Sequence, residues 1–146
     1  MQYKNIINEL KVNCPLPEAF EETPSQASSN QSSRKLVHIR ADYSKGKWWN
    51  TIWPYHDELS TPEIRRDVDA VYNALTSSDA FSDLHTLTAL CLGHPEAQVN
   101  GHNPDEFHFY FISELCYYRL HCICRTNDYN LYLHVFLKNM EVGPDA

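Results

Sequence analysis

Histidine, arginine and tyrosine recur at alternate positions along the stretch 104–138, which reads PDEFHFYFISELCYYRLHCICRTNDYNLYLHVFLK. Imidazoles titrate near neutral pH, so two of them can act as general acid and base, and a guanidinium can hold a phosphate or an oxyanion. Tyrosine and arginine are also enriched at the binding hot spots of protein interfaces. The stretch therefore indicates either metal-free phosphoryl or acyl chemistry or a binding surface.

Three β-strands would position these side chains. Strict alternation of apolar and polar residues predicts strands over about 106–112, 116–125 and 129–137. The gaps Ser113-Glu114 and Asn127-Asp128 are short, which predicts hairpins and antiparallel neighbours. Two-residue loops pair apolar residues throughout, for example Phe109 with Tyr118, whereas a shift of one residue mixes apolar with polar partners. One face of this sheet is therefore expected to be the core.

The opposite face, called the histidine face below, collects the polar side chains. The predicted register sets His121 opposite His134 and His108 opposite Arg119, with Cβ atoms about 4.5–5.5 Å apart. Leu36–Tyr43 also alternates and predicts a fourth strand whose polar side joins the same face. The histidine face then consists of His38, Arg40, Asp42, His108, Tyr110, Tyr117, Arg119, His121, Ile123, Arg125, Tyr132, His134 and Phe136.

Two helices are expected between the strands. Ser60-Thr61-Pro62-Glu63 has the residues of a helix start: either Ser60 and Glu63 form a capping box, or Thr61 caps the helix with Pro62 at its first position. Apolar residues follow at helical spacing as far as Leu75. A second helix is predicted over about Asp79–Leu92. On the first helix, the residues expected to face water are Arg65, Arg66, Asp67 and Asp69.

The first 35 residues differ from the rest. A short helix is predicted within 3–12, and residues 23–33 are almost wholly Ser, Gln, Asn and Pro, which predicts a mobile linker. We therefore expect residues 1–35 to form a flexible N-terminal arm and 36–146 to form a single domain. Its fold class is α+β, with an antiparallel meander sheet of about four strands and two helices packed on one face.

The net charge of the chain is −7, and residues 51–114 hold most of it, with eleven Asp/Glu against two Lys/Arg. This balance argues against binding of duplex DNA, where phosphate contacts dominate affinity. No run of 18 apolar residues and no signal-peptide pattern is present, so we expect no membrane partner and a cytoplasmic location. Five cysteines are interpreted as reduced thiols, mostly in the core.

A catalytic hypothesis assigns the acid and base to His121 and His134, the anion clamp to Arg119, and an orienting role to Tyr132 or Asp42. A metal hypothesis would use the two histidines or the polar loop that contains His94, Glu96, His102 and Asp105. It is the weaker of the two, because Cys122 and Cys124 are not spaced as a zinc pair and are expected to point into the core. We therefore predict no metal site and no cofactor.

A binding hypothesis fits the composition best. The sequence favours a small acidic interaction or inhibitor protein that uses the histidine face or the acidic 51–114 segment, with a metal-independent histidine-based nuclease or phosphodiesterase as the alternative. A protein partner suits the negative charge, and single-stranded RNA is a second candidate. In a third interpretation, the N-terminal helix or the tryptophan segment simply covers the histidine face. The candidate binding residues are His38, Arg40, Trp48, Trp49, His108, Tyr110, Tyr117, Arg119, His121, Tyr132 and His134.

Overall fold

All strands in the described part of the chain join one antiparallel sheet, and the described helices form a second layer. The computed structural model describes residues 6–23, 35–52, 61–94, 105–124 and 129–138. Within these ranges the sheet has six strands in the order β1-β4-β5-β6-β2-β3. The strands are β1 (Glu21–Glu22), β2 (Lys35–Ser44), β3 (Lys47–Ile52), β4 (Glu106–Ile112), β5 (Cys116–Ile123) and β6 (Tyr129–Leu137).

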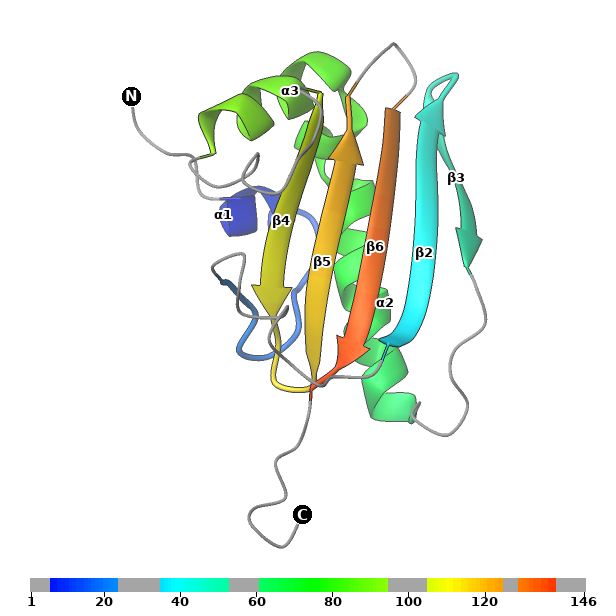
Figure 1. Cartoon of the computed structure of the whole chain (residues 1–146), viewed down its shortest axis with the longest axis vertical. Coiled ribbons are helices and arrows are strands. Elements are labelled where there is room, and N and C mark those ends of the chain that lie inside the picture. Colours follow the sequence, from blue (N-terminus) through cyan, green and yellow to red (C-terminus); the bar gives the residue numbers. More distant parts are fainter. Residues whose placement is uncertain (1–5, 24–34, 53–60, 95–104, 125–128, 139–146) are drawn as a thin grey trace, which may run out of the picture.

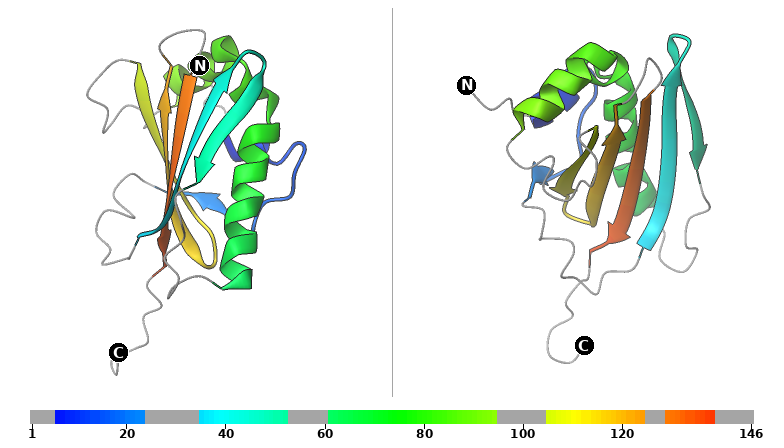
Figure 2. Two further views of the ribbon diagram at one scale, coloured as in Figure 1. Left: turned by 90° about the vertical axis from the view of Figure 1, so that its right-hand side faces the viewer. Right: turned by 45° about the horizontal axis from the view of Figure 1, so that its top comes forward.

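The helices of the described ranges lie on one side of this sheet (Figures 1 and 2). None of them has the length and apolar character needed to cross a membrane. The fold is therefore α+β with an antiparallel sheet, as the alternation predicted. The helices are α1 (Ile6–Leu10), α2 (Pro62–Ser77), the 3-10 helix η1 (Asp79–Ser82) and α3 (Leu84–Gly93).

The expected number of about four strands is wrong, because β1 and β3 also join the sheet. β1 is only two residues long and pairs with the end of β4, so it is too short for an alternating pattern to predict it. β3 lacks a clean alternation, and its pairing with β2 comes from the tight turn between them. Lys45 and Gly46 in that turn have φ values of 55° and 79°, the positive values that two-residue hairpin loops favour.

Side-chain caps set where the helices begin. Thr61 accepts a hydrogen bond from the backbone N–H of Ile64 at 3.2 Å, and Pro62 occupies the first helical position, as predicted. The single helix expected over Asp79–Leu92 is divided. Asp83 accepts from the backbone N–H of Thr86 at 2.9 Å and so begins α3 anew after η1.

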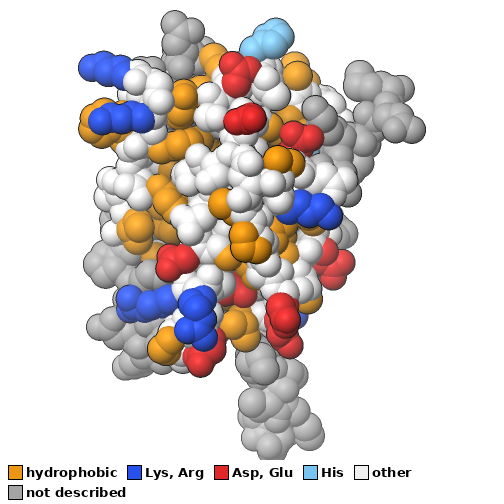
Figure 3. Space-filling model, turned by 180° about the vertical axis from the view of Figure 1, so that it is seen from behind, with side chains coloured by type: hydrophobic (Ala, Val, Ile, Leu, Met, Phe, Trp, Pro, Cys, Tyr) orange, Lys and Arg blue, Asp and Glu red, His pale blue; other side chains and the backbone are white. Residues whose placement is uncertain are grey.

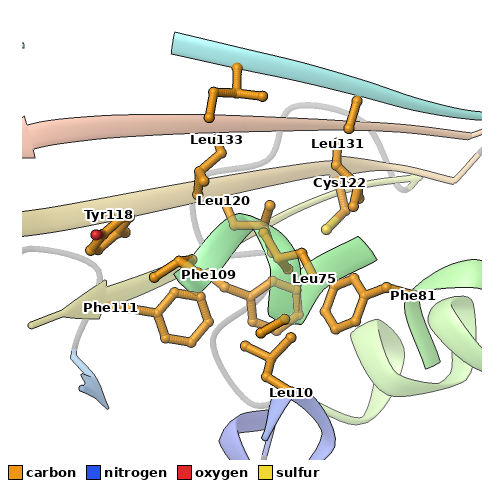
Figure 4. Close-up of a cluster of buried hydrophobic side chains, with 14 of the residues drawn as sticks. Leu10, Leu75, Phe81, Phe109, Phe111, Tyr118, Leu120, Cys122, Leu131 and Leu133 are labelled. Atoms are coloured by element: carbon orange, nitrogen blue, oxygen red, sulfur yellow. The ribbon is translucent and has the colours of Figure 1, made fainter. Parts of the chain in front are cut away.

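The core lies between the sheet and the helices (Figure 4). Phe81 and Leu75 from the helical layer meet Phe109 and Leu120 of the sheet, and all four side chains are buried. Ile6 and Leu10 of α1 belong to the same core cluster. The division into residues 1–35 and 36–146 stays a prediction, since residues 24–34 lie outside the described ranges. The described part of the N-terminal segment nevertheless packs on the sheet and α2.

The predicted face is confirmed for the strand residues that the structure describes, which excludes Arg125, but both hairpin registers are wrong by two residues. Phe109 pairs with Leu120 rather than Tyr118, and His121 lies opposite Tyr132 rather than His134. A two-residue shift keeps every side chain on its face, so alternation cannot detect it. In the first hairpin the cause is Ser113, whose Oγ accepts the backbone N–H groups of Leu115 and Cys116 and forms a longer connection.

Asp67 was expected to face water, but it is buried beneath the sheet with 9% of its surface exposed. Its carboxylate accepts hydrogen bonds from Ser113 Oγ at 2.7 Å and from Tyr118 Oη at 2.5 Å. Asp67 lies three residues after Ile64 and four before Val71, so helical spacing places it on the buried stripe. It ties α2 to the turn between β4 and β5.

Candidate binding face

The histidine face is the side of the sheet away from the described helices (Figure 2). The observed register arranges its central residues in two rows across β4, β5, β6 and β2. One row reads Tyr110, Arg119, His134 and His38, and the next reads His108, His121, Tyr132 and Arg40. Eight of the predicted site residues therefore come together, although in pairs that differ from the predicted ones.

The four histidines stack in two pairs. The rings of His38 and His134 have centroids 4.3 Å apart with an angle of 23° between their planes. His108 and His121 stack at the same distance and 21°. Tyr132 lies between the pairs, with its centroid 6.0 Å from that of His38 and 5.7 Å from that of His121. The rings on this face therefore pack mainly against one another.

One end of the face holds matched charges. The Nε of Arg40 donates to both carboxylate oxygens of Asp42 at 3.1 Å, and Asn130 donates to the same carboxylate. The hydrogen bond to Asp42 raises the pKa of Arg40 above its ordinary value. His121 Nε2 lies 3.0 Å from Glu106 Oε1. These contacts neutralise or orient the groups that they join.

The other end of the face is dominated by cations. Burial lowers the pKa of His134 to about 3, and repulsion from Arg119 and Lys35 acts in the same direction. Burial, Lys35 and Arg119 also lower the pKa of His38. Burial lowers the pKa of Lys35 itself, with a further contribution from Arg119. The positive charge of Arg119 therefore lies close enough to His134, His38 and Lys35 to disfavour a proton on each of them.

The two candidate tryptophans lie on opposite faces. Trp49 is on the histidine face opposite Asp42, half exposed, with the Lys47 ammonium 4.1 Å from the ring centroid. Trp48 lies on the core side and packs edge-on against Tyr43 and Tyr129. The structure therefore removes Trp48 from the candidate surface. Tyr117 and Tyr110 lie on the histidine face, and Tyr110 is buried there. Arg125 lies outside the described residues.

Sequence reasoning missed Lys35 and Glu106. Glu106 is two residues before His108, so the alternation itself places it on the histidine face. Lys35 gave the opposite signal, because alternation groups it with Val37 on the core side. A β-bulge between Lys35 and Val37 turns Leu36 inward, and Lys35 lies opposite Phe136 on the histidine face.

In the part of the chain that the structure describes, no three His, Cys, Asp or Glu side chains are arranged to hold a metal ion. These residues therefore give the metal hypothesis no support. His94 contacts Glu22 and lies edge-on to Phe109. Glu96 and His102 lie outside the described ranges. Cys122 is fully buried on the core side, as expected.

All five cysteines are free thiols. Cys91 of α3 hydrogen-bonds with Cys122 and with Cys124, and the pKa of all three thiols is raised. The main cause is the bond to Cys122 for Cys91, burial for Cys122, and the bond to Cys91 for Cys124. A raised pKa disfavours the nucleophilic thiolate. This cluster is therefore part of the core rather than a reactive site.

Comparison of the chain with protein-family models, curated proteins and solved structures found no match.

Proposed function

We propose that this chain is a small interaction or inhibitor protein that binds a protein partner through its histidine face. The observation that supports the proposal best is the arrangement of two rows of histidine, tyrosine and arginine across four strands, on the side of the sheet without described helices. Tyrosine and arginine are the residues that most often dominate the affinity of protein interfaces.

A protein partner is favoured over single-stranded RNA by the packing of the rings. Stacking platforms for bases need exposed ring faces. Here His38 stacks on His134 and His108 stacks on His121. Arg40 lies over Tyr132, 5.6 Å from its centroid. Ring faces that already pack against a neighbour are less available for bases to stack on. These side chains instead offer a partner their ring edges, hydrogen-bonding groups and charge.

The acidic 51–114 segment is the weaker candidate surface. Its described part includes α2, which exposes Arg65 and Arg66 beside Glu63 and Asp69. On the helix-covered side of the molecule, acidic and basic side chains lie scattered among apolar ones (Figure 3). Such a mixture does not form the continuous acidic ridge that a mimic of nucleic acid would need.

Affinity capture with matched charge reversals tests the proposal. Arg40→Glu changes the exposed end of the histidine face, and Arg66→Glu makes the same charge change on exposed α2. We expect a partner that the wild type and Arg66→Glu retain and that Arg40→Glu loses by at least about tenfold. Equal loss in both variants, with each folded, would contradict a role of this face.

The alternative function, a metal-independent nuclease or phosphodiesterase, is favoured by one contact. Glu106 lies 3.0 Å from His121 Nε2, as a carboxylate that orients a catalytic imidazole would. Against it, the low pKa of His134, about 3, makes this imidazole a weak base and leaves it unprotonated at neutral pH. A folded His121→Ala variant that loses hydrolysis of a phosphodiester reporter in EDTA would favour the enzyme.

A further inference from the structure

Two fixed cations on the histidine face have no acid beside them in the part of the chain that the structure describes. By contrast, Arg40 is bound to Asp42 and His121 contacts Glu106, so these two basic groups have acidic neighbours. Neither Arg119 nor Lys35 forms an ion pair within the described ranges. Arg119 is partly buried, which weakens the screening that water would provide, whereas Lys35 is exposed at the start of β2.

The same end of the face holds enclosed nitrogen atoms without acceptors. Arg119 Nε and His134 Nδ1 are both buried and have no hydrogen-bond partner among the described residues. Arg119 and His134 are direct cross-strand neighbours on β5 and β6, and His38 of β2 follows in the same row. Buried polar groups in native proteins normally have partners, so a missing acceptor points to a ligand.

We propose that Lys35, Arg119 and His134 form a binding subsite for a phosphomonoester group on the protein partner. This inference rests on the proposed function and specifies the chemistry of its partner. A phosphomonoester has a charge of about −1.5 to −2 at neutral pH and three acceptor oxygens. It therefore matches the two fixed positive charges of Lys35 and Arg119, whereas a carboxylate or a phosphodiester has a single charge.

The position of Lys35 strengthens the inference. The bulge at Leu36 breaks the alternation of β2 and brings the Lys35 ammonium to the cationic end of the face. Without the bulge, this lysine would lie on the core side with Val37. Bulges often redirect a side chain next to a functional site.

Titration with phenyl phosphate tests the subsite directly. At pH 7.5 and constant ionic strength, the NMR signals of the His134 and His38 rings should shift saturably as phenyl phosphate is added. Benzoate and chloride at equal ionic strength should give little shift. Arg119→Gln and Lys35→Gln should each weaken phenyl phosphate binding about tenfold, because each removes a charge-assisted hydrogen bond.

Lys47→Gln is the matched control, since it removes the same charge from the same face beside Trp49. Equal weakening by Lys47→Gln would show general attraction of anions and would overturn the subsite. A uridine dinucleotide that binds as tightly as phenyl phosphate would overturn the phosphomonoester in favour of a nucleic-acid backbone. If Arg119→Gln fails to fold, Lys35→Gln decides, because Lys35 is an exposed residue at the end of β2.

The subsite and the proposed function can fail separately. Capture of a partner that depends on Arg40, without any binding of phenyl phosphate, would leave the protein-binding face intact and remove the subsite. Saturable phenyl phosphate binding, together with an Arg40→Glu variant that captures the same partners as wild type, would keep the subsite and overturn the wider interface.

Discussion

Side chains of the same type have different surroundings on the histidine face. His121 has a carboxylate beside it, that of Glu106, while His134 faces Arg119 and Lys35. The two stacked histidine pairs therefore lie at the acidic and the cationic ends of one surface. Their neighbours, rather than the imidazole itself, decide which charge each pair can accept.

The protonation of His134 makes stability depend on pH. Its pKa is about 3 in the folded protein and about 6.5 when unfolded. The unfolded chain therefore binds more protons between these values, and stability is lost as pH falls below about 6.5. The charged groups that face His134 all lower its pKa: Arg119 and His121 on β5, and His38 and Lys35 on β2.

When the pH falls from 7 to 5, the free energy of unfolding should decrease by about 1–2 kcal/mol less in His134→Gln than in the wild type. Urea unfolding at both pH values measures the difference. The control is His85→Gln, at an exposed position on α3, which should show the wild-type pH dependence. Identical pH profiles for wild type and His134→Gln would refute the assignment.

The buried carboxylate of Asp67 supports a second prediction. Asp67→Ala leaves Tyr118 Oη and Ser113 Oγ without their shared acceptor, so the free energy of unfolding should fall by about 2–4 kcal/mol. Asp69→Ala, on the exposed side of the same helix, should change it by less than about 0.5 kcal/mol. Chemical denaturation of both variants tests this, and similar values for the two would contradict the network.

At the scale of elements, alternation predicted the faces of the strands and failed on their register. Apolar residues at every second position indicate which side chains point inward, but they are equally satisfied by registers that differ by two. The connection after β4 follows from hydrogen bonds of Ser113 that no periodic pattern contains. The predicted pair of His121 with His134 belongs to the other hairpin, between β5 and β6, and was wrong because alternation fits a register two residues away equally well.

Other predictions were wrong for reasons local to a few residues. Lys35 was missed because a bulge interrupts the period, and Asp67 was misplaced because its polarity outweighed its helical position. β1 was missed because two glutamates give no strand signal. The same sequence cues succeeded where chemistry is local, as at Thr61 and Pro62, which begin α2 at the predicted place.

The turn between β2 and β3 gives a prediction at this scale. Gly46 has a φ of 79°, and nothing lies within 4 Å of the position that a Cβ would take, so the cost of a side chain there is conformational. Gly46→Ala should destabilise the protein by about 1–2 kcal/mol. Lys45→Asn should be neutral or stabilising, because asparagine tolerates the φ of 55° better. Thermal denaturation distinguishes the two, and equal effects would contradict the turn assignment.

For the whole molecule, the N-terminal segment contributes to the core. Ile6 and Leu10 are buried, and Phe20 stacks on Phe111 with centroids 5.1 Å apart. β1 then pairs with β4 at the edge of the sheet. The helix expected to be part of a flexible arm is thus packed among residues from the C-terminal half.

A chain that begins at residue 24 should therefore fail to fold stably, which tests the division at residue 35. Leu10→Ala alone should lower the free energy of unfolding by about 2–5 kcal/mol, whereas Val12→Ala, at a position 70% exposed, should change it little. Circular dichroism and urea unfolding provide the measurements. A truncated chain with wild-type stability would support an independent domain from residue 36 onward.

The order of the strands also affects how the chain is made. β6 is the last of the described strands to leave the ribosome, yet it lies between β5 and β2. It places His134 beside His38, a residue 96 positions earlier in the chain. Until it emerges, β2 with β3 and β4 with β5 can form only separate hairpins with unsatisfied edges. The sheet, and with it the cationic end of the histidine face, is therefore completed only once β6 has been synthesised. A nascent chain that stops before β6 leaves the edge of β2 available to chaperones or to other strands.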